Sequence, residues 1–491
     1  MTFAALAGAQ APVTGPQLVV TPRARVLPAS ATNRPFLSAA RALQPVDLAP
    51  RGYTEVELAV SGQASIYDWS GVAGEAIAVR AASIAYVTRV LARRPVDPAK
   101  ASGLVIVELL DPTSVADSAP LWALSWEHFL RRGDVWVGVT VKPSALAALR
   151  RFDAVRYGSL SFAYRQPAEC QSQAGAAADA ESGLAWDVIA QVGALLRSSS
   201  KENPLWDMQP HQVIAAGYAQ GGDYVTTFAN VLHRWQRRGS DGPIFDGYLT
   251  AGASSAVPIN QCAAALPEAD PRRGALPRDV PFVRVATESD FNLAPALRRD
   301  DSDEPADVFR LYEIAATGHN VAIDAGLPNA ADARMVGSAQ PATDLCREPR
   351  GGLPLGTALN AIWQQYDQWL KAGVVMLRVP RIETFPDGST RRDERGNTTG
   401  GWRLPQLDMP LARYAGSSTP KDASDAARNT CALTASQQPF DAARLKQLYQ
   451  NRNEYLRRLR AAIDQAVVER RLVKEDGDAL KNPPVQSLPA F

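Results

Sequence analysis

Near its middle the chain reads Val213-Ile214-Ala215-Ala216-Gly217-Tyr218-Ala219-Gln220-Gly221-Gly222-Asp223-Tyr224. An apolar run ends there in a turn of small residues, and a helical pattern follows it. This order of strand, tight turn and helix is the setting of the G-x-S-x-G elbow, which holds a nucleophile in a strained turn between two glycines. Gly217 and Gly221 stand at the glycine positions. The central residue is Ala219, which has no oxygen with which to attack a substrate.

Two interpretations of this stretch are open. Short glycine patterns recur by chance, so residues 217–222 fit an ordinary strand-to-helix turn. They also fit the elbow of a hydrolase whose nucleophile is absent, either naturally or through a deliberate Ser→Ala change at Ala219. The remaining residues decide between the two.

Composition describes an ordinary globular protein with a large core. Of 491 residues, 46% are hydrophobic and 21% are charged. The net charge of +1 and the lack of a basic block argue against nucleic acid as a partner. No apolar run approaches the 18 or more residues of a membrane span.

Strand-like and helical segments alternate along the chain. We expect strands, besides the elbow strand, at 54–61, 76–88, 104–110, 134–141, 244–251, 281–287 and 309–315. Helices are expected at 121–130, 182–197 and 353–370. This alternation predicts the α/β class, with a doubly wound, mostly parallel sheet and right-handed crossovers.

Three regions follow from this pattern. Residues 1–50 are predicted to form an N-terminal arm. Residues 51–372 form the α/β core, with irregular cap insertions at about 144–180 and 253–279. Residues 373–491 form an extension packed on the core, turn-rich at first and helical at 439–472.

A hydroxyl nucleophile needs a base, and only four histidines are available. His128 lies inside a predicted helix, His211 precedes the elbow strand, and His233 lies on the elbow helix, well past Ala219. His319 alone follows a strand, where sites in such sheets gather. We therefore expect His319 to be the base.

The carboxylate that orients the base should lie between the elbow and His319. Residues 287–290 read Thr-Glu-Ser-Asp after a strand and offer Glu288 and Asp290. The order nucleophile, acid, histidine is that of α/β hydrolases. Asp290 is favoured as the acid, Glu288 stays the alternative, and the other one is expected to be a supporting hydrogen-bond partner.

Backbone amides should stabilise a developing oxyanion. Gln220, directly after the nucleophile position, is expected to supply one, and Leu110 or Asp111, after the strand at 104–110, the other. Tyr218, Trp206 and Phe291 are near enough in sequence to line a substrate pocket, which would suit a bulky or aromatic ester.

Two features bear on the compartment. Ala9-Gln10-Ala11 looks like the cleavage end of a signal peptide remnant at 1–11, although a plain alanine-rich tail reads similarly. The four cysteines, namely Cys170, Cys262, Cys346 and Cys431, are widely spaced and form no CxxC or Cys/His cluster, which argues against a metal site. Their even number allows free thiols or up to two disulfides. The pairing stays open.

Three blocks now carry a specific resemblance: residues 217–222, 287–290 and 316–320. Together with Arg156-Tyr157 and residues 396–405, they resemble a bacterial branch of the α/β-hydrolase superfamily known as "alpha/beta hydrolase domain-containing protein". The resemblance covers about 50–485 and implies a periplasmic or secreted serine esterase with a Ser-His-acid triad. The departure is Ala219, where that branch has serine.

The expected function is hydrolysis of a carboxylic ester through an acyl-enzyme at position 219, inactivated here by alanine. A natural pseudoenzyme that binds a small ligand, a lactone hydrolase, and a scaffold built on 439–472 are the alternatives. The expected partner is a small ester or lactone, with no cofactor and no metal. The oligomeric state is left open.

Overall fold

The computed structural model describes residues 12–30, 33–70, 76–113, 115–168, 170, 179–208, 210–238, 242–338, 344–484 and 488–489. The predicted signal-peptide remnant at 1–11 and part of the predicted cap at 144–180 lie outside these residues.

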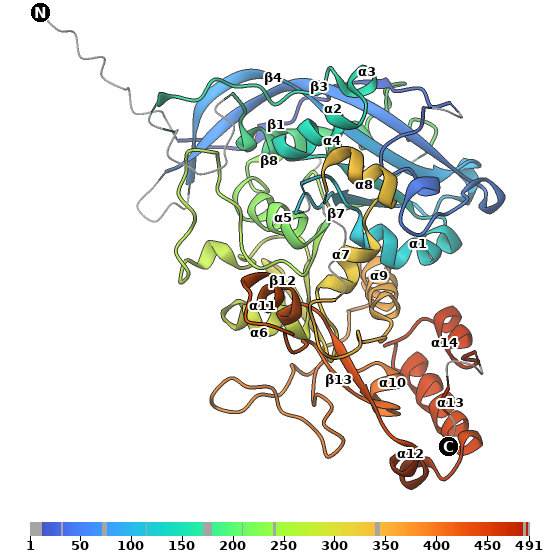
Figure 1. Ribbon diagram of the computed structural model, residues 1–491. Helices are drawn as coiled ribbons and strands as arrows, with labels where there is room; N and C mark the ends of the chain where they lie inside the picture. Colours follow the sequence, from blue (N-terminus) through green and yellow to red (C-terminus); the bar gives the residue numbers. More distant parts are fainter. Residues whose placement is uncertain are drawn as a thin grey trace, which may run out of the picture.

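A ten-stranded sheet runs through the molecule in the order β11-β12-β10-β9-β7-β5-β6-β4-β3-β2 (Figure 1). Its strands from β6 across to β12 pair in parallel, while β2, β3 and β4 on one side and β11 on the other pair antiparallel. The predicted fold class is confirmed. The strands of this sheet are β2 (Arg23–Val26), β3 (Tyr53–Ser70), β4 (Ala76–Pro95), β5 (Leu104–Leu109), β6 (Val135–Val139), β7 (Gln212–Tyr218), β9 (Gly247–Ala251), β10 (Phe282–Thr287), β11 (Ser302–Glu304) and β12 (Asp307–Ile314).

The central strands are buried on both faces, which explains their continuous apolar sequences. Along β5, Val105 and Val107 belong to one hydrophobic cluster and Leu104 and Ile106 to the other, because successive side chains point to opposite faces. Helices α2, α4 and α5 contribute to the first cluster, and α1 and α9 to the second. The sheet is therefore covered by helices on both sides.

The longer helices are α1 (Pro120–Arg132), α2 (Pro143–Phe152), α4 (Ala185–Arg197), α5 (Ala219–Val231), α9 (Leu355–Ala372) and α13 (Arg452–Val468). The shorter ones are α3 (Ala154–Tyr157), α6 (Glu288–Leu293), α7 (Asn320–Ala325), α8 (Ala330–Val336), α10 (Pro405–Asp408), α11 (Asp425–Ala432), α12 (Ala442–Tyr449) and α14 (Lys474–Leu480). Two small ribbons pair β1 (Gln17–Leu18) with β8 (Gln236–Arg237), and β13 (Ala412–Ala415) with β14 (Ser436–Pro439).

The region predicted to be irregular from 144 to 180 contains the helices α2 and α3 in its first part. Proline at the first position starts α2, and Leu146 and Leu149 bury one side of it in the core. The helix was missed because half of its buried residues are alanine, which weakens the apolar periodicity. By contrast, the described backbone from 253 to 279 holds only one short 3₁₀ turn, at Pro271–Arg273.

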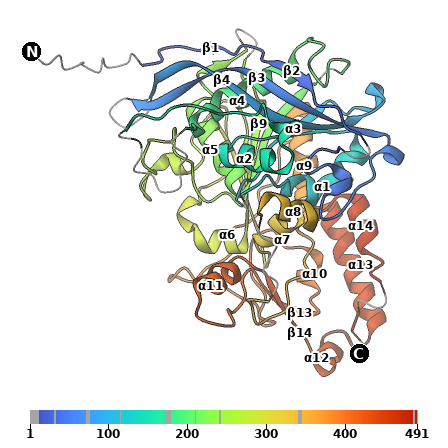
Figure 2. The same cartoon turned by 45° about the horizontal axis from the view of Figure 1, so that its top comes forward.

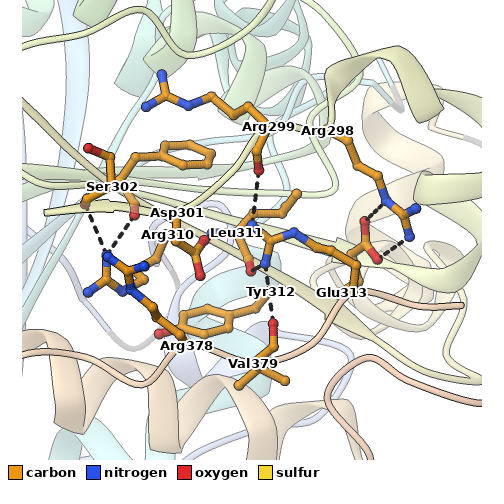
Figure 3. A network of polar contacts seen from close by, with 12 residues as sticks. Arg298, Arg299, Asp301, Ser302, Arg310, Leu311, Tyr312, Glu313, Arg378 and Val379 are labelled. Atoms are coloured by element: carbon orange, nitrogen blue, oxygen red, sulfur yellow. Dashed lines mark hydrogen bonds and ion pairs between the residues drawn. The ribbon is translucent and has the colours of Figure 1, made fainter.

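Charged side chains on β12 and on the segments next to it connect the C-terminal extension, residues 373–491, to this side of the sheet (Figure 3). Arg298 donates to both carboxylate oxygens of Glu313, each at 2.6 Å, and the same carboxylate accepts the amide of Ile382 at 2.7 Å. Arg381 reaches back to the carbonyl of Leu311 at 2.6 Å. Residues 381–382 are thereby fixed against the core.

Helices α13 and α14 lie beside α1 and α9 (Figures 1 and 2). Asp476 of α14 accepts hydrogen bonds from Arg131 of α1 at 2.9 Å and from Asn360 of α9 at 2.7 Å. Leu445, Leu459 and Ile463 belong to a small buried cluster of their own. The extension thus has a small hydrophobic core of its own. The many charged residues of this region make that core hard to predict from the sequence.

Two disulfides close long loops and settle the pairing that the sequence left open. Cys170 is joined to Cys262 with Cα atoms 4.9 Å apart, and Cys346 to Cys431 with Cα atoms 5.6 Å apart. Within the described part of the chain, no helix combines the length and apolar character that crossing a membrane requires.

Candidate active site

The predicted elbow lies at the carboxyl end of β7, in the middle of the sheet. Ala219 begins α5 with φ of 47°, a left-handed conformation that costs a non-glycine residue roughly 1–2 kcal/mol. A Cβ on Gly217 would lie 2.3 Å from the carbonyl carbon of Gly221, and one on Gly221 would lie 2.2 Å from the carbonyl oxygen of Leu109. Both glycines are required because backbone approaches them so closely.

His319 and Asp290 meet beside this elbow. His319 Nδ1 lies 2.8 Å from Asp290 Oδ1, and the other carboxylate oxygen accepts the backbone amide of Thr287 at 2.8 Å and its hydroxyl at 2.7 Å. The His319 amide donates to Ser289 Oγ at 2.9 Å. Thr287 and Asp290 form a capping box at the start of α6, and this T-x-x-D pattern is readable in the sequence.

Electrostatics favour a charged pair at these two side chains. Burial lowers the pKa of His319, but the charge and hydrogen bond of Asp290 outweigh it and leave the pKa raised, with smaller contributions from Asp111 and Asp223. Burial raises the pKa of Asp290, but His319 and Thr287 outweigh it and leave that pKa lowered. With Nδ1 held by a carboxylate, Nε2 of the neutral ring is the nitrogen free to accept a proton.

Glu288, the alternative acid, faces away from His319. Its fully buried carboxylate accepts the amide of Ala316 at 2.7 Å, a hydrogen bond from Thr398 Oγ1, and one from Arg392 at 3.0 Å. Side chains two positions apart at a helix start point in different directions, so only Asp290 reaches the histidine. Glu288 instead ties together the acid loop, the histidine loop and the C-terminal extension.

Tyr218, directly before the elbow, contacts the loop that carries His319. Its hydroxyl donates to the carbonyl of His319 at 3.0 Å, and the two ring centroids lie 5.1 Å apart. Only 1% of Tyr218 is exposed, so it holds His319 in place and does not offer a surface to a ligand as predicted.

The two other aromatic residues predicted to line a pocket lie elsewhere. Trp206 is 49% exposed and precedes the amino end of β7, whereas the elbow is at the carboxyl end. Phe291 packs under Arg298, whose guanidinium carbon is 4.0 Å from the ring centroid, and borders a hollow shared with residues 384–392. Nearness in sequence was a poor guide because Trp206 lies before the opposite end of β7, and Phe291, on α6, faces the C-terminal extension.

The backbone amides predicted to stabilise an oxyanion differ in whether they already donate a hydrogen bond. The Gln220 amide lies in the first turn of α5, where amides lack an acceptor within the helix. The Leu110 amide donates to Val139 at 3.0 Å, and the Asp111 amide donates to Ser118 at 3.0 Å. Neither is free to face the elbow, in contrast to the prediction, because hydrogen bonding continues past the end of β5.

The remaining histidines lie away from this pair. His128 is buried in α1, where burial and nearby Arg132 lower its pKa to about 3. His233 contacts Tyr248 Oη at 2.9 Å and pairs with Asp279. In the described residues, no group of three or more His, Cys, Asp and Glu side chains is arranged to hold a metal ion.

A cavity of about 430 Å³ opens next to the elbow, between α2, α5 and the loop at 257–261. Gln220 forms part of its wall, whereas Ala219 and His319 do not. Other lining residues are Lys142, Ser144, Leu146, Phe162, Tyr224 and Asn260. Sequence reasoning missed Lys142, although a charged residue just beyond the end of a central strand is a usable signal.

Comparison with known protein families gives a match over most of the chain. The alpha/beta hydrolase domain family matches residues 13–482. No curated protein matches the chain. Similar solved structures include an a/b serine hydrolase without lid from Xanthomonas campestris, at 11% identity over 57% of this chain and 97% of that one, with a TM-score of 0.26.

Two esterases show likeness of the same order. A Rhizomucor miehei esterase is 10% identical over 57% of this chain and 81% of its own, with a TM-score of 0.28. Esterase 2 of Thermogutta terrifontis is 12% identical over 46% of this chain and 76% of its own, with a TM-score of 0.26. Similarity this low carries no argument, so the assignment of this chain to a protein family rests on the family match alone.

Proposed function

The chain belongs to the alpha/beta hydrolase domain family, and from this premise we propose that its site hydrolyses carboxylic esters when serine occupies position 219. With Ala219 in place, the same site binds an ester without turning it over. The observation that carries the proposal is the pairing of His319 with Asp290 at 2.8 Å, next to a strained elbow.

The geometry suits an acyl-enzyme mechanism. A serine hydroxyl at position 219 would give its proton to His319 Nε2 as its oxygen attacks the ester carbonyl. Asp290 would orient the ring through Nδ1 and stabilise the imidazolium. The Gln220 amide would donate to the oxyanion. His319 would then protonate the leaving alcohol, and water would release the acid by the same steps.

A second candidate, a natural pseudoenzyme that binds a small ligand, is favoured by Ala219 itself. The intact glycines, acid and histidine around it favour the enzyme, because drift after natural loss of activity would also affect these positions. The genomic codon separates the two: serine indicates a deliberate substitution, and alanine supports the binding protein. A lactone is an alternative substrate because it presents the same carbonyl.

The test is Ala219→Ser, assayed on 4-nitrophenyl esters and lactones. Loss of triad members lowers kcat by about six orders of magnitude elsewhere, so we expect a gain of that order. A further His319→Ala change should abolish the gain, while exposed His211→Ala in the same background should keep it. Ala219→Ser protein that is folded by circular dichroism yet inert on the whole panel would refute the enzyme.

We also propose that the protein works in the periplasm or outside the cell. Two disulfides, joining Cys170 to Cys262 and Cys346 to Cys431, support this compartment because such bonds persist in oxidising surroundings. Fractionation of the source cells tests it, and recovery of the protein in the cytoplasm alone would refute it.

A further inference from the structure

Lys142 places a positive charge beside the elbow, and no carboxylate of the described residues forms an ion pair with it. Its Nζ donates to Gln220 Oε1 at 2.6 Å. Burial lowers its pKa, while the charge of Asp111 acts in the opposite direction. In the described part of the chain Lys142 forms no ion pair, unlike Lys371, Lys421, Lys474 and Lys481. A half-buried ammonium of this kind gains most from an anion that arrives with a ligand.

Asp111 acts on Lys142 through its charge but forms no ion pair with it. Its buried carboxylate accepts hydrogen bonds from Thr113 Oγ1 at 2.6 Å and Ser118 Oγ at 3.3 Å, and burial raises its pKa. The carboxylate is therefore committed to its own loop.

The cavity beside Lys142 has further donors on the same wall. Lys142 is followed directly by α2, whose first turn carries partial positive charge and receives no side-chain cap. Ser144 Oγ is buried there without a hydrogen-bond partner among the described residues. Arg150 lies farther along the wall, with one nitrogen on the carbonyl of Leu160. Among the described residues of the lining, Asp179 is the one acid. The volume of about 430 Å³ is typical of small-molecule sites.

Gln220 connects this wall to the reacting centre. Its backbone amide lies at the elbow, and its side-chain oxygen is held by Lys142. A negative group on Lys142 would therefore be linked to position 219 through Gln220. A single ammonium with hydroxyl donors suits a carboxylate, whereas phosphate sites favour arginine forks or several backbone amides.

We propose that this cavity is a carboxylate subsite and that the substrate is a half-ester of a dicarboxylic acid, with its free carboxylate on Lys142 and Ser144. The inference rests on the proposed function for its reaction, but the binding step stands apart from it. Ala219 allows binding to be measured without turnover.

The kinetic arm compares mono-4-nitrophenyl adipate with its methyl diester, which has the same chain but no charge. In Ala219→Ser protein we expect kcat/KM to be about tenfold to a hundredfold higher for the half-ester, the range of one hydrogen bond to a charged group. Lys142→Met should bring this ratio close to one. Lys446→Met, on α12 at the far end of the molecule (Figures 1 and 2), is the matched control and should keep the ratio.

The binding arm uses calorimetry of the Ala219 protein with monomethyl adipate. We expect binding that weakens with salt and is lost in Lys142→Met. Equal specificity for both esters in active Ala219→Ser protein, unchanged by Lys142→Met, would overturn the subsite and leave the esterase intact. Salt-dependent binding that needs Lys142, without turnover by Ala219→Ser protein, would refute the esterase and support the subsite.

Discussion

Exchanging the two neighbouring carboxylates for amides should separate catalysis from stability. In the Ala219→Ser background, Asp290→Asn keeps the shape of the side chain but puts an NH₂ group where an acceptor stood. If the NH₂ group faces Thr287, it lies opposite the backbone amide that donates to the carboxylate at 2.8 Å. If the NH₂ group faces His319, Nδ1 must accept a hydrogen bond, and the ring takes the other tautomer. The first orientation leaves the buried amide of Thr287 without an acceptor. The second orientation leaves Nε2 of His319 protonated and unable to act as the base.

The magnitudes follow from these contacts. We expect Asp290→Asn to lower kcat by about 10⁴-fold, the size of the equivalent change in a serine protease, and to cost about 2 kcal/mol of stability for one charged hydrogen bond. Glu288→Gln keeps one oxygen that can still accept from Ala316 and Thr398, but it turns an NH₂ donor toward Arg392 and removes that buried ion pair. It should cost about 3 kcal/mol, the lower end for a broken buried pair because Arg392 is partly exposed, and lower kcat less.

The assays are steady-state hydrolysis of 4-nitrophenyl butyrate and urea unfolding of the same proteins. The expected result is a crossed pattern in which Asp290→Asn is the slower enzyme and Glu288→Gln the less stable protein. A larger kcat loss in Glu288→Gln, with its stability intact, would refute the assignment of Asp290 as the acid.

The pH dependence gives an independent check on the same pair. Because the pKa of His319 is raised in the folded protein, its stabilising contribution is fully present below the unfolded value of about 6.5 and is lost as pH rises through the folded pKa. Asp290→Asn should therefore flatten the decline of Tm above about pH 6.5. An unchanged profile would show that other charges, such as Asp111, dominate the pKa of His319.

Two further predictions concern the scaffold. Gly221→Ala should cost about 3 kcal/mol, since its Cβ would lie 2.2 Å from the Leu109 carbonyl oxygen, whereas Gly373→Ala, at positive φ but in open space, should cost about 1 kcal/mol; equal urea midpoints would contradict this. The denatured, unreduced protein should show no titratable thiol with Ellman's reagent, and reduction should lower stability by up to about 4 kcal/mol for each loop of 92 or 85 residues; four reactive thiols would disprove both bonds.

Local chemistry made much of the site readable in the sequence. Gly217 and Gly221 identify the elbow because only glycine tolerates backbone contacts of 2.2–2.3 Å at the Cβ position. His319 follows from where strands end, and the alternation of apolar runs predicts the parallel sheet. These features depend on neighbours within one or two elements, so a single chain segment is enough to reveal them.

Tertiary packing decided the rest. Asp290 and Glu288 are two residues apart and chemically alike; which one meets His319 depends on the Thr287 capping box and on Arg392 and Thr398, more than 100 residues away. The cysteine pairing, the Leu110 amide engaged by Val139, and the position of Phe291 against residues 384–392 likewise depend on segments distant in sequence. The sequence by itself determined which residues could react, and the fold determined which of them meet, because direction and distance are set only when separate segments pack.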